Sequence, residues 1–334
     1  MRLVVQIPCL NEEATIGETI REIHAATADF DDVLILVVDD GSTDSTVETA
    51  FKAGADHVVR HRINRGLARA FMTGLAVSLN LGADIIVNTD ADNQYNATSI
   101  PDLVSPIRDG LADMVVGARP ISDIQHFSPL KKRLQRMGSK MVRFLSDTKV
   151  ADATSGFRAI SRDTALRLNT FSDYTYTLET LIQAGRSGLS VMSVDIDCNP
   201  PTRGSRLISN VRTYVWKSSF DMLRTFAVYA PLRAYMLIGS IPFGFSVLFG
   251  IRYLVLITFV DPARSHAPSL ILAAILAGLG FLVMGIGIIG QLLDVNRRIL
   301  EELRLNQRRE ALAQTGIVPQ VCYEVASPIE GERT

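Results

Sequence analysis

The stretch DIIVNTDADNQ, residues 84–94, decides the fold: an apolar β-rich run ends in two carboxylates and a carboxamide. Helical patterns flank this run, near residues 44–53 and 66–81, and another helix is predicted from Glu12 with Asn11 as its N-cap. Similar β-rich runs lie at 3–7, 33–38, 57–60 and 114–118. Apolar strands that alternate with helices predict an α/β domain with a mostly parallel, Rossmann-like sheet covered on both faces.

Polar groups follow these strands, at the edge where open α/β sheets bind ligands. The first strand leads into PCLNEE (8–13) and the second into DDGSTD (39–44). Neither G-x-G-x-x-G nor the P-loop pattern follows these strands, which disfavours a dinucleotide site or a P-loop. After the fourth strand, Asp90, Asp92 and Gln94 offer hard oxygen ligands that suit Mg²⁺ or Mn²⁺, with a diphosphate filling the remaining positions.

The composition indicates contact with lipid. The 334 residues are 47% hydrophobic and 21% charged, and the mean hydropathy is +0.20. Residues 234–251 are uncharged, and residues 269–295 carry only Asp294, so both segments are long enough to cross a bilayer. A buried helical hairpin of a soluble protein is the alternative. Arginines and lysines flank the pair on one side, which predicts that both termini face the cytoplasm.

Charge and cysteine content exclude other classes. The formal net charge of −1 argues against nucleic acid as a partner. The three widely spaced cysteines indicate neither a disulfide framework nor a cysteine zinc site. Residues 128–146 form a basic, amphipathic helical pattern that fits an anionic membrane surface or, equally, a core-facing stripe with a solvated basic face. Glycines in the second apolar segment favour close helix contact, including a homo-oligomer through the membrane helices.

The pattern divides the chain into four parts. We expect a catalytic domain over 1–200, a basic interfacial segment over 201–231, a hairpin over 232–295 with helices at 232–260 and 269–293, and a cytoplasmic tail over 296–334. The predicted location is a cell (inner) membrane, with a multi-pass anchor and a cytoplasmic catalytic domain.

Five motifs occur in the order found in one enzyme family: IPCLNEE, VVDDGSTD, DADNQ, the VGAR of 116–119 and the D-x-x-SGFR of 152–158. Together they resemble the family 2 glycosyltransferases of GT-A fold. With the C-terminal hairpin, the chain is most similar to the polyprenyl-phosphate glycosyltransferases of that family. The resemblance implies a metal-dependent hexosyltransferase that uses a nucleotide-sugar donor.

The resemblance also implies roles for single residues. A nucleoside pocket is implied for Pro8, Leu10, Glu12, Asp39 and Asp40. Asp90, Asp92 and Gln94 match the metal site, with Asp90 also facing the donor and Asp92 counted as catalytic, while Ser205 and Arg206 match a loop that closes on the donor diphosphate. Contact with the acceptor phosphate is implied for Arg119, Lys132, Arg133 and Arg136, and Asp152, beside the active site, is either an orienting group or a loop cap.

These parts predict an inverting transfer of one sugar from a UDP- or GDP-sugar to a polyprenyl phosphate. The phosphate is already an oxyanion, so it needs cations rather than a strong base. One alternative is a membrane glycosyltransferase with a neutral lipid or glycan acceptor, in which Asp152 or Glu179 would serve as base. Another is a catalytically silent anchor that binds nucleotide-sugars.

Overall fold

The computed structural model describes residues 1–119, 150–170, 176–199, 224, 227–260, 267–315, 317 and 324–326. Contacts divide the chain into two compact units. The first combines Met1–Val211 with Leu303–Thr334, and the second is Arg212–Glu302. The contacts thus group the end of the chain with the first unit, and the division into four parts stays a prediction.

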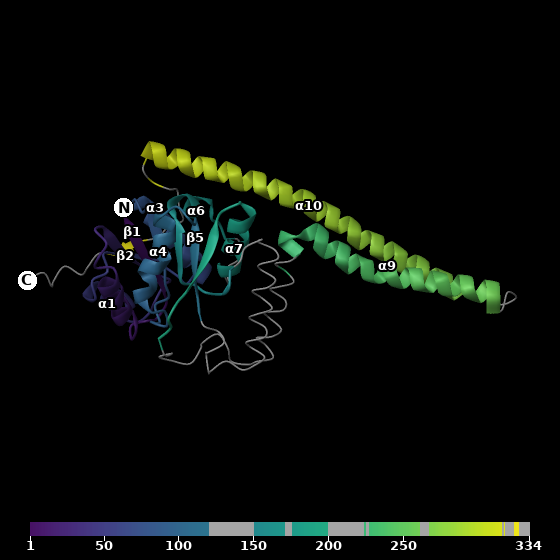
Figure 1. Ribbon diagram of the computed structural model, residues 1–334, viewed down its shortest axis with the longest axis horizontal. Helices are drawn as coiled ribbons and strands as arrows, with labels where there is room; N and C mark the ends of the chain where they lie inside the picture. Colours follow the sequence, from purple (N-terminus) through teal and green to yellow (C-terminus); the bar gives the residue numbers. More distant parts are fainter. Residues whose placement is uncertain are drawn as a thin grey trace, which may run out of the picture. The chain divides into compact units, whose positions relative to one another are not determined.

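The first unit is built on one mixed sheet (Figure 1). In the described residues its order is β7-β5-β6-β4-β1-β2-β3-β8, with β6 antiparallel to both neighbours and β8 antiparallel to β3. The other neighbours pair in parallel. The strands are β1 (Leu3–Cys9), β2 (Val33–Asp39), β3 (His57–Arg60), β4 (Ile85–Asn88), β5 (Met114–Ala118), β6 (Arg158–Ser161), β7 (Val191–Asp195) and β8 (Glu324–Ala326).

Helices cover both faces of this sheet (Figure 1). They are α1 (Ile16–Ala26), α2 (Thr46–Lys52), α3 (Leu67–Asn80), the 3₁₀ turn η1 (Ala97–Ser99), α4 (Ile100–Arg108), α6 (Arg162–Arg167) and α7 (Thr177–Arg186). Alternation along β1 explains the two layers. Leu3, Val5 and Ile7 join one buried cluster with α1 and α4, whereas Gln6 faces α3, where Gly74 leaves room for its side chain.

The first helix begins later than predicted. Asn11 is not its N-cap, because α1 starts at Ile16 and Thr15 precedes it. Asn11 instead has a left-handed backbone with φ of 54°, and its side-chain oxygen accepts a hydrogen bond from the Thr43 amide at 2.8 Å. The side chain thus ties the loop after β1 to the turn after β2, a long-range contact that outcompetes local helix capping.

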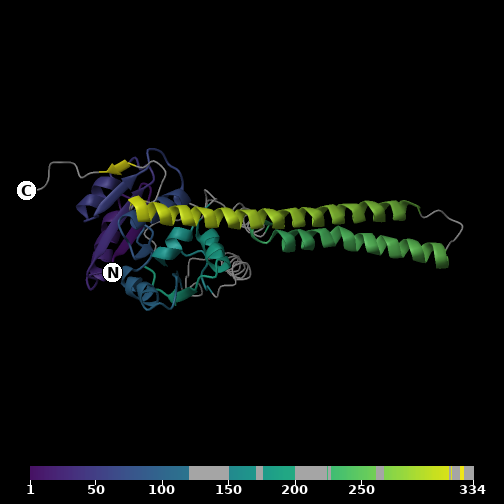
Figure 2. The same ribbon diagram turned by 90° about the horizontal axis from the view of Figure 1, so that it is seen from above.

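The second unit contains the apolar helix α9 (Pro231–Val255), continued by the π-helical turn η2 (Leu256–Val260), and the first part of α10 (Ala267–Thr315), whose residues from Leu303 on belong to the first unit. The segments Pro231–Phe259 and Ala267–Gln314 are long and apolar enough to be candidate transmembrane helices. They lie side by side in both views (Figure 1, Figure 2). The Phe243 and Phe281 rings meet edge to face at 5.2 Å, as expected for a packed hairpin.

Glycines set how closely the two helices approach. A Cβ added at Gly239 would lie 2.9 Å from the carbonyl oxygen of Gly280, and one at Gly290 would lie 2.7 Å from Pro231. Gly278 and Gly285 face open space in the described part of the chain. Part of the glycine pattern therefore serves packing within the hairpin, and self-association through the outer glycines stays a prediction.

The last turns of α10, which belong to the first unit, pack beside α6. Arg308 is 8% exposed, and its guanidinium donates to the carbonyl oxygens of Leu166 (2.8 Å) and Leu168 (3.0 Å) at the end of α6. Arg309 forms an ion pair with Asp163. Beyond the helix, β8 adds a strand beside β3, which covers that edge of the sheet.

Candidate active site

The carboxyl ends of β1 and β2 lie side by side because these strands are parallel, and they gather the predicted nucleoside pocket: Pro8, Leu10, Glu12, Asp39 and Asp40. Asp39 ends β2 and is fully buried. Its carboxylate accepts hydrogen bonds from the Ser42 amide at 3.1 and 3.2 Å, and it pairs with Arg60 Nε at 3.0 Å. Arg60 was not singled out from the sequence, although it ends β3 and lies in register with Asp39.

Asp40 faces into the fold. Its oxygens accept from the amides of Arg65 (2.9 Å) and Gly66 (2.8 Å) and lie 2.7 Å from His61 Nδ1. Because a carboxylate only accepts, Nδ1 carries a proton, and Nε2 lies 3.0 Å from the Thr73 hydroxyl. Asp40 therefore anchors the loop between β3 and α3, and its predicted place beside the nucleoside base stays a prediction.

The cation loop, residues 90–94, follows β4. Asp90, Asp92 and Gln94 are each half-buried. Burial, and then the charge of Asp92, raises the pKa of Asp90 to about 7. Among the described residues none donates a hydrogen bond to the Asp90 carboxylate, whereas Asp92 accepts one from the Gln94 amide at 3.2 Å. A buried carboxylate beside a second carboxylate is the electrostatic signature of a site that a cation would stabilise.

This donor set fits Mg²⁺ or Mn²⁺ in part. Two carboxylates and an amide oxygen are hard ligands of the kind these ions prefer. In the described part of the chain no three His, Cys, Asp or Glu side chains converge as a metal cage. Asp90, Asp92 and Gln94 would therefore hold the ion together with oxygen atoms of a substrate.

Arg119 follows β5 and is held by Asp152. Its Nε lies 2.6 Å and its terminal nitrogen 3.2 Å from the two carboxylate oxygens, and that nitrogen also donates to Thr154 at 2.9 Å. Burial alone would lower the pKa of Arg119, but Tyr95 and Asp152 outweigh it, so the pKa is raised. Burial would raise the pKa of Asp152, yet the hydrogen bond and charge of Arg119 lower it. Both groups therefore stay ionised. Of the cations that lower the pKa of Asp90 in the cation loop, Arg119 has the largest effect.

The arginine-holding loop, residues 152–158, is fixed from beneath by Arg158. This guanidinium is fully buried and donates to Ser155 O (2.8 Å), Ala153 O (3.0 Å) and Thr180 Oγ1 (2.8 Å). Burial lowers its pKa to about 10, so it remains protonated at neutral pH. A charge buried without a carboxylate partner in the described residues is costly, which indicates that the loop's shape matters.

The structure thus brings three groups to one sheet edge: the Asp39 region, the cation loop and Arg119 with Asp152. All follow strands of the same direction. The remaining predicted residues lie outside the described residues, so the structure does not place them: Lys132, Arg133, Arg136, Ser205 and Arg206.

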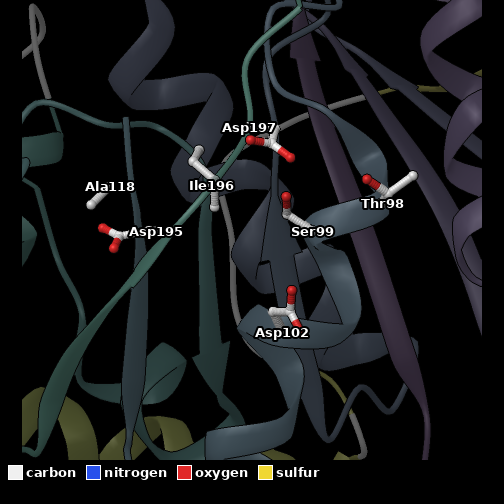
Figure 3. A pocket seen from close by; sticks show the side chains of 7 residues that line it. All are labelled: Thr98, Ser99, Asp102, Ala118, Asp195, Ile196 and Asp197. Carbon is white, nitrogen blue, oxygen red and sulfur yellow. The ribbon is translucent and has the colours of Figure 1, made fainter. Parts of the chain in front are cut away.

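A separate cavity of about 320 Å³ opens at the carboxyl ends of β5 and β7, beside the start of α4 (Figure 3). Ser99 and Asp197 point toward one another across it (Figure 3). None of the predicted site residues that the structure describes lines this cavity. Its lining is Thr98, Ser99, Asp102, Ala118, Asp195, Ile196 and Asp197.

Residues 4–167 match the family model described as glycosyl transferase family 2. The chain is 31% identical over 212 residues to a UDP-N-acetylglucosamine–dolichyl-phosphate N-acetylglucosaminyltransferase of Methanococcus voltae, covering 57% of this chain and 82% of the relative.

 The chain is also 25% identical over 343 residues to an undecaprenyl-phosphate 4-deoxy-4-formamido-L-arabinose transferase of Salmonella dublin, covering 99% of this chain and 97% of the relative.

Among solved structures, glucosyl-3-phosphoglycerate synthase of Mycobacterium tuberculosis, in complex with Mn²⁺, UDP and glucosyl-3-phosphoglycerate, is similar with a TM-score of 0.54. The identity is 25%, and the match covers 68% of this chain and 78% of that one.

Proposed function

Because the chain belongs to glycosyl transferase family 2, we propose that it moves one sugar from a UDP- or GDP-sugar to a polyprenyl phosphate. Membership confirms the predicted family, the GT-A fold and the prediction of a sugar-transferring enzyme. One observation carries the proposal further: a carboxylate pair suited to a cation and an arginine suited to a phosphate stand at the same sheet edge.

The donor side combines the nucleoside pocket with the cation loop. We assign the nucleoside to the edge formed by Pro8, Leu10, Glu12 and Asp39, with Arg60 beside Asp39. Asp90, Asp92 and Gln94 would hold Mg²⁺ or Mn²⁺, and the solved relative with Mn²⁺ and UDP supports this assignment. Such an ion would supply positive charge that stabilises a leaving diphosphate.

The acceptor side depends on Arg119. A polyprenyl phosphate is an oxyanion at neutral pH, so a guanidinium that orients it toward C1 of the sugar is sufficient. Asp152 keeps that guanidinium in place through two contacts. A single in-line displacement by the phosphate oxygen inverts the anomeric centre. Both relatives are named as transferases of lipid phosphates, dolichyl in one case and undecaprenyl in the other, which supports the acceptor class.

The contacts of Asp152 favour this acceptor over a hydroxyl. A neutral lipid or glycan would need a general base with an available carboxylate. Asp152 is 1% exposed, its oxygens are engaged by Arg119 and Thr154, and its pKa is lowered. It suits the role of an orienting group.

The hairpin supplies the membrane anchor. We place α9 and α10 across a cell membrane as a multi-pass anchor, with the catalytic unit and both termini on the cytoplasmic side. The match to the Salmonella dublin transferase extends over the hairpin as well as the catalytic unit, which supports a shared anchor. Lys132, Arg133 and Arg136 would then meet the acceptor phosphate at the membrane surface.

The test is a transfer assay with purified protein in detergent, Mg²⁺ or Mn²⁺ and radiolabelled UDP- and GDP-sugars. Undecaprenyl phosphate is the acceptor and undecaprenol its uncharged control. We expect label in the organic phase with the phosphate only, and none with Asp92→Ala. Transfer to undecaprenol would favour a neutral acceptor, whereas nucleotide binding without any transfer would favour a silent anchor.

A further inference from the structure

Two loops from distant parts of the chain meet at Gly156. Its carbonyl oxygen accepts from Asn88 Nδ2 at 2.8 Å, and its amide donates to the Tyr95 hydroxyl at 3.0 Å. A Cβ added at Gly156 would lie 2.9 Å from the Tyr176 hydroxyl and 3.0 Å from Asp90 Oδ1. The backbone of the arginine-holding loop therefore lies directly against the first carboxylate of the cation loop.

Tyr95 is held on several sides. It follows the cation loop, is 7% exposed, and its ring stacks on Phe157 at 5.2 Å with an interplanar angle of 23°. The Gln94 carbonyl beside it accepts from the Asn199 amide at 2.9 Å. Burial raises the pKa of Tyr95 to about 12, so the phenol stays neutral and its oxygen accepts the Gly156 amide. Both the ring and the hydroxyl of Tyr95 therefore contact the arginine-holding loop.

The other end of the arginine-holding loop binds Arg119. Asp152 and Thr154 bind the Arg119 guanidinium, and Asp152 also accepts from the Thr154 amide at 3.1 Å. A continuous set of hydrogen bonds thus runs from Tyr95 through the loop backbone to Arg119. The spacing between the cation loop and Arg119 therefore depends on this loop, which is bonded to Tyr95 at one end and to Arg119 at the other.

We propose that Tyr95 is a positioning residue: its hydroxyl fixes the arginine-holding loop and thereby sets where Arg119 stands relative to Asp90 and Asp92. The consequence for turnover rests on the proposed function, in which Arg119 orients the acceptor phosphate. Tyr95→Phe leaves the Gly156 amide buried without a partner. The loop then loosens, and we expect the KM for undecaprenyl phosphate to rise about tenfold, with UDP affinity in Mn²⁺ unchanged.

Tyr176→Phe is the matched control. Tyr176 is also buried, also touches Gly156, and loses one hydrogen bond, from Asn88 Nδ2 at 3.0 Å, when its hydroxyl is removed. Asn88 keeps its bond to Gly156 O in that variant. Both variants should therefore lose similar thermal stability, but only Tyr95→Phe should raise the acceptor KM.

Two measurements decide the proposal. Hydrogen exchange of the peptide covering residues 150–160, without substrate, should speed up in Tyr95→Phe more than in Tyr176→Phe. In a double-mutant cycle, Tyr95→Phe should have little further effect on acceptor KM once Arg119→Lys is present, because both act on one contact. Equal exchange in Tyr95→Phe and wild type, or additive effects in the cycle, would overturn it. If wild type transfers no sugar, the proposed function fails, and the exchange comparison still tests Tyr95.

Discussion

Two acidic pairs stand at the ends of β2 and β4, the two neighbours of β1, and they have opposite surroundings. Asp39 and Asp40 are met by donors: backbone amides, Arg60 and His61. Asp90 is buried, the charge of Asp92 raises its pKa, and it lacks a hydrogen-bond donor among the described residues. The same residue type therefore stabilises the fold at the end of β2 and is held in an unfavourable environment at the end of β4.

This difference has a thermodynamic sign. The pKa of Asp90 rises from 3.8 to about 7 on folding, so the protonated form is favoured in the folded state. Its contribution to stability is present below pH 4 and is lost as pH rises through 7. The first pair stabilises the fold, whereas the charge of Asp90 opposes folding at neutral pH in the absence of a bound cation.

The largest expected effect is on activity. Asp92→Ala removes a proposed ligand, and we expect sugar transfer to fall about 10³-fold while the protein still folds. The transfer assay and a thermal melt measure the two properties. Asp197→Asn is the control, since Asp197 is a carboxylate of the separate cavity. Comparable losses of sugar transfer in both variants would show that Asp92 is no more important for the reaction than a carboxylate of the separate cavity.

Asp40→Ala should cost the most stability. It leaves His61 and the amides of Arg65 and Gly66 without their buried acceptor, for a loss of about 3 kcal/mol in the free energy of unfolding. Denaturant unfolding in detergent measures this, with Asp102→Ala as an acidic control. A free energy of unfolding of Asp40→Ala like that of wild type would show that Asp40 does not stabilise the fold.

Asp90→Asn should stabilise the protein while abolishing transfer. Removal of the charge relieves the burial penalty, so the melting temperature should rise by roughly 5 °C at pH 8 without divalent cations. The gain should vanish below pH 4, where Asp90 is protonated in both states. Melts across pH 4–8 test the sign, and a variant less stable than wild type at pH 8 contradicts it.

The smallest effect is expected for Arg60, the partly exposed ion-pair partner of Asp39. The Arg60 side chain is 45% exposed, so Arg60→Gln should lower the melting temperature only slightly. UDP or GDP should bind about fivefold more weakly, because Asp39 loses the cation that orients it. Titration calorimetry with both nucleotides checks this, with Arg62→Gln as a nearby control. Unchanged affinity for both UDP and GDP would show that Arg60 does not contribute to the nucleoside pocket.

The sequence predicted what depends on local pattern. Apolar runs marked the strands from β1 to β5, and Asp90 and Asp92 were found because they follow one of them. The sequence did not predict contacts between residues that are distant in the chain. Asn11 was assigned as a helix cap because its contact to Thr43 is invisible in the local sequence.

Tyr95 escaped notice for the same reason, since its partner Gly156 lies 61 positions away in the chain. Arg60 is an intermediate case: the parallel register of β2 and β3 places it beside Asp39, and that register follows from aligning the two strand ends.

The strand β8 has a consequence for the order of synthesis. A ribosome makes the chain from its N-terminus, so Glu324–Ala326 emerges after both apolar helices. Until then the hydrogen-bonding edge of β3 has no partner from this segment, and an open edge invites pairing with other chains. The catalytic sheet is therefore completed last, once the hairpin has already left the ribosome, and a chain that stops short of residue 324 keeps that edge open.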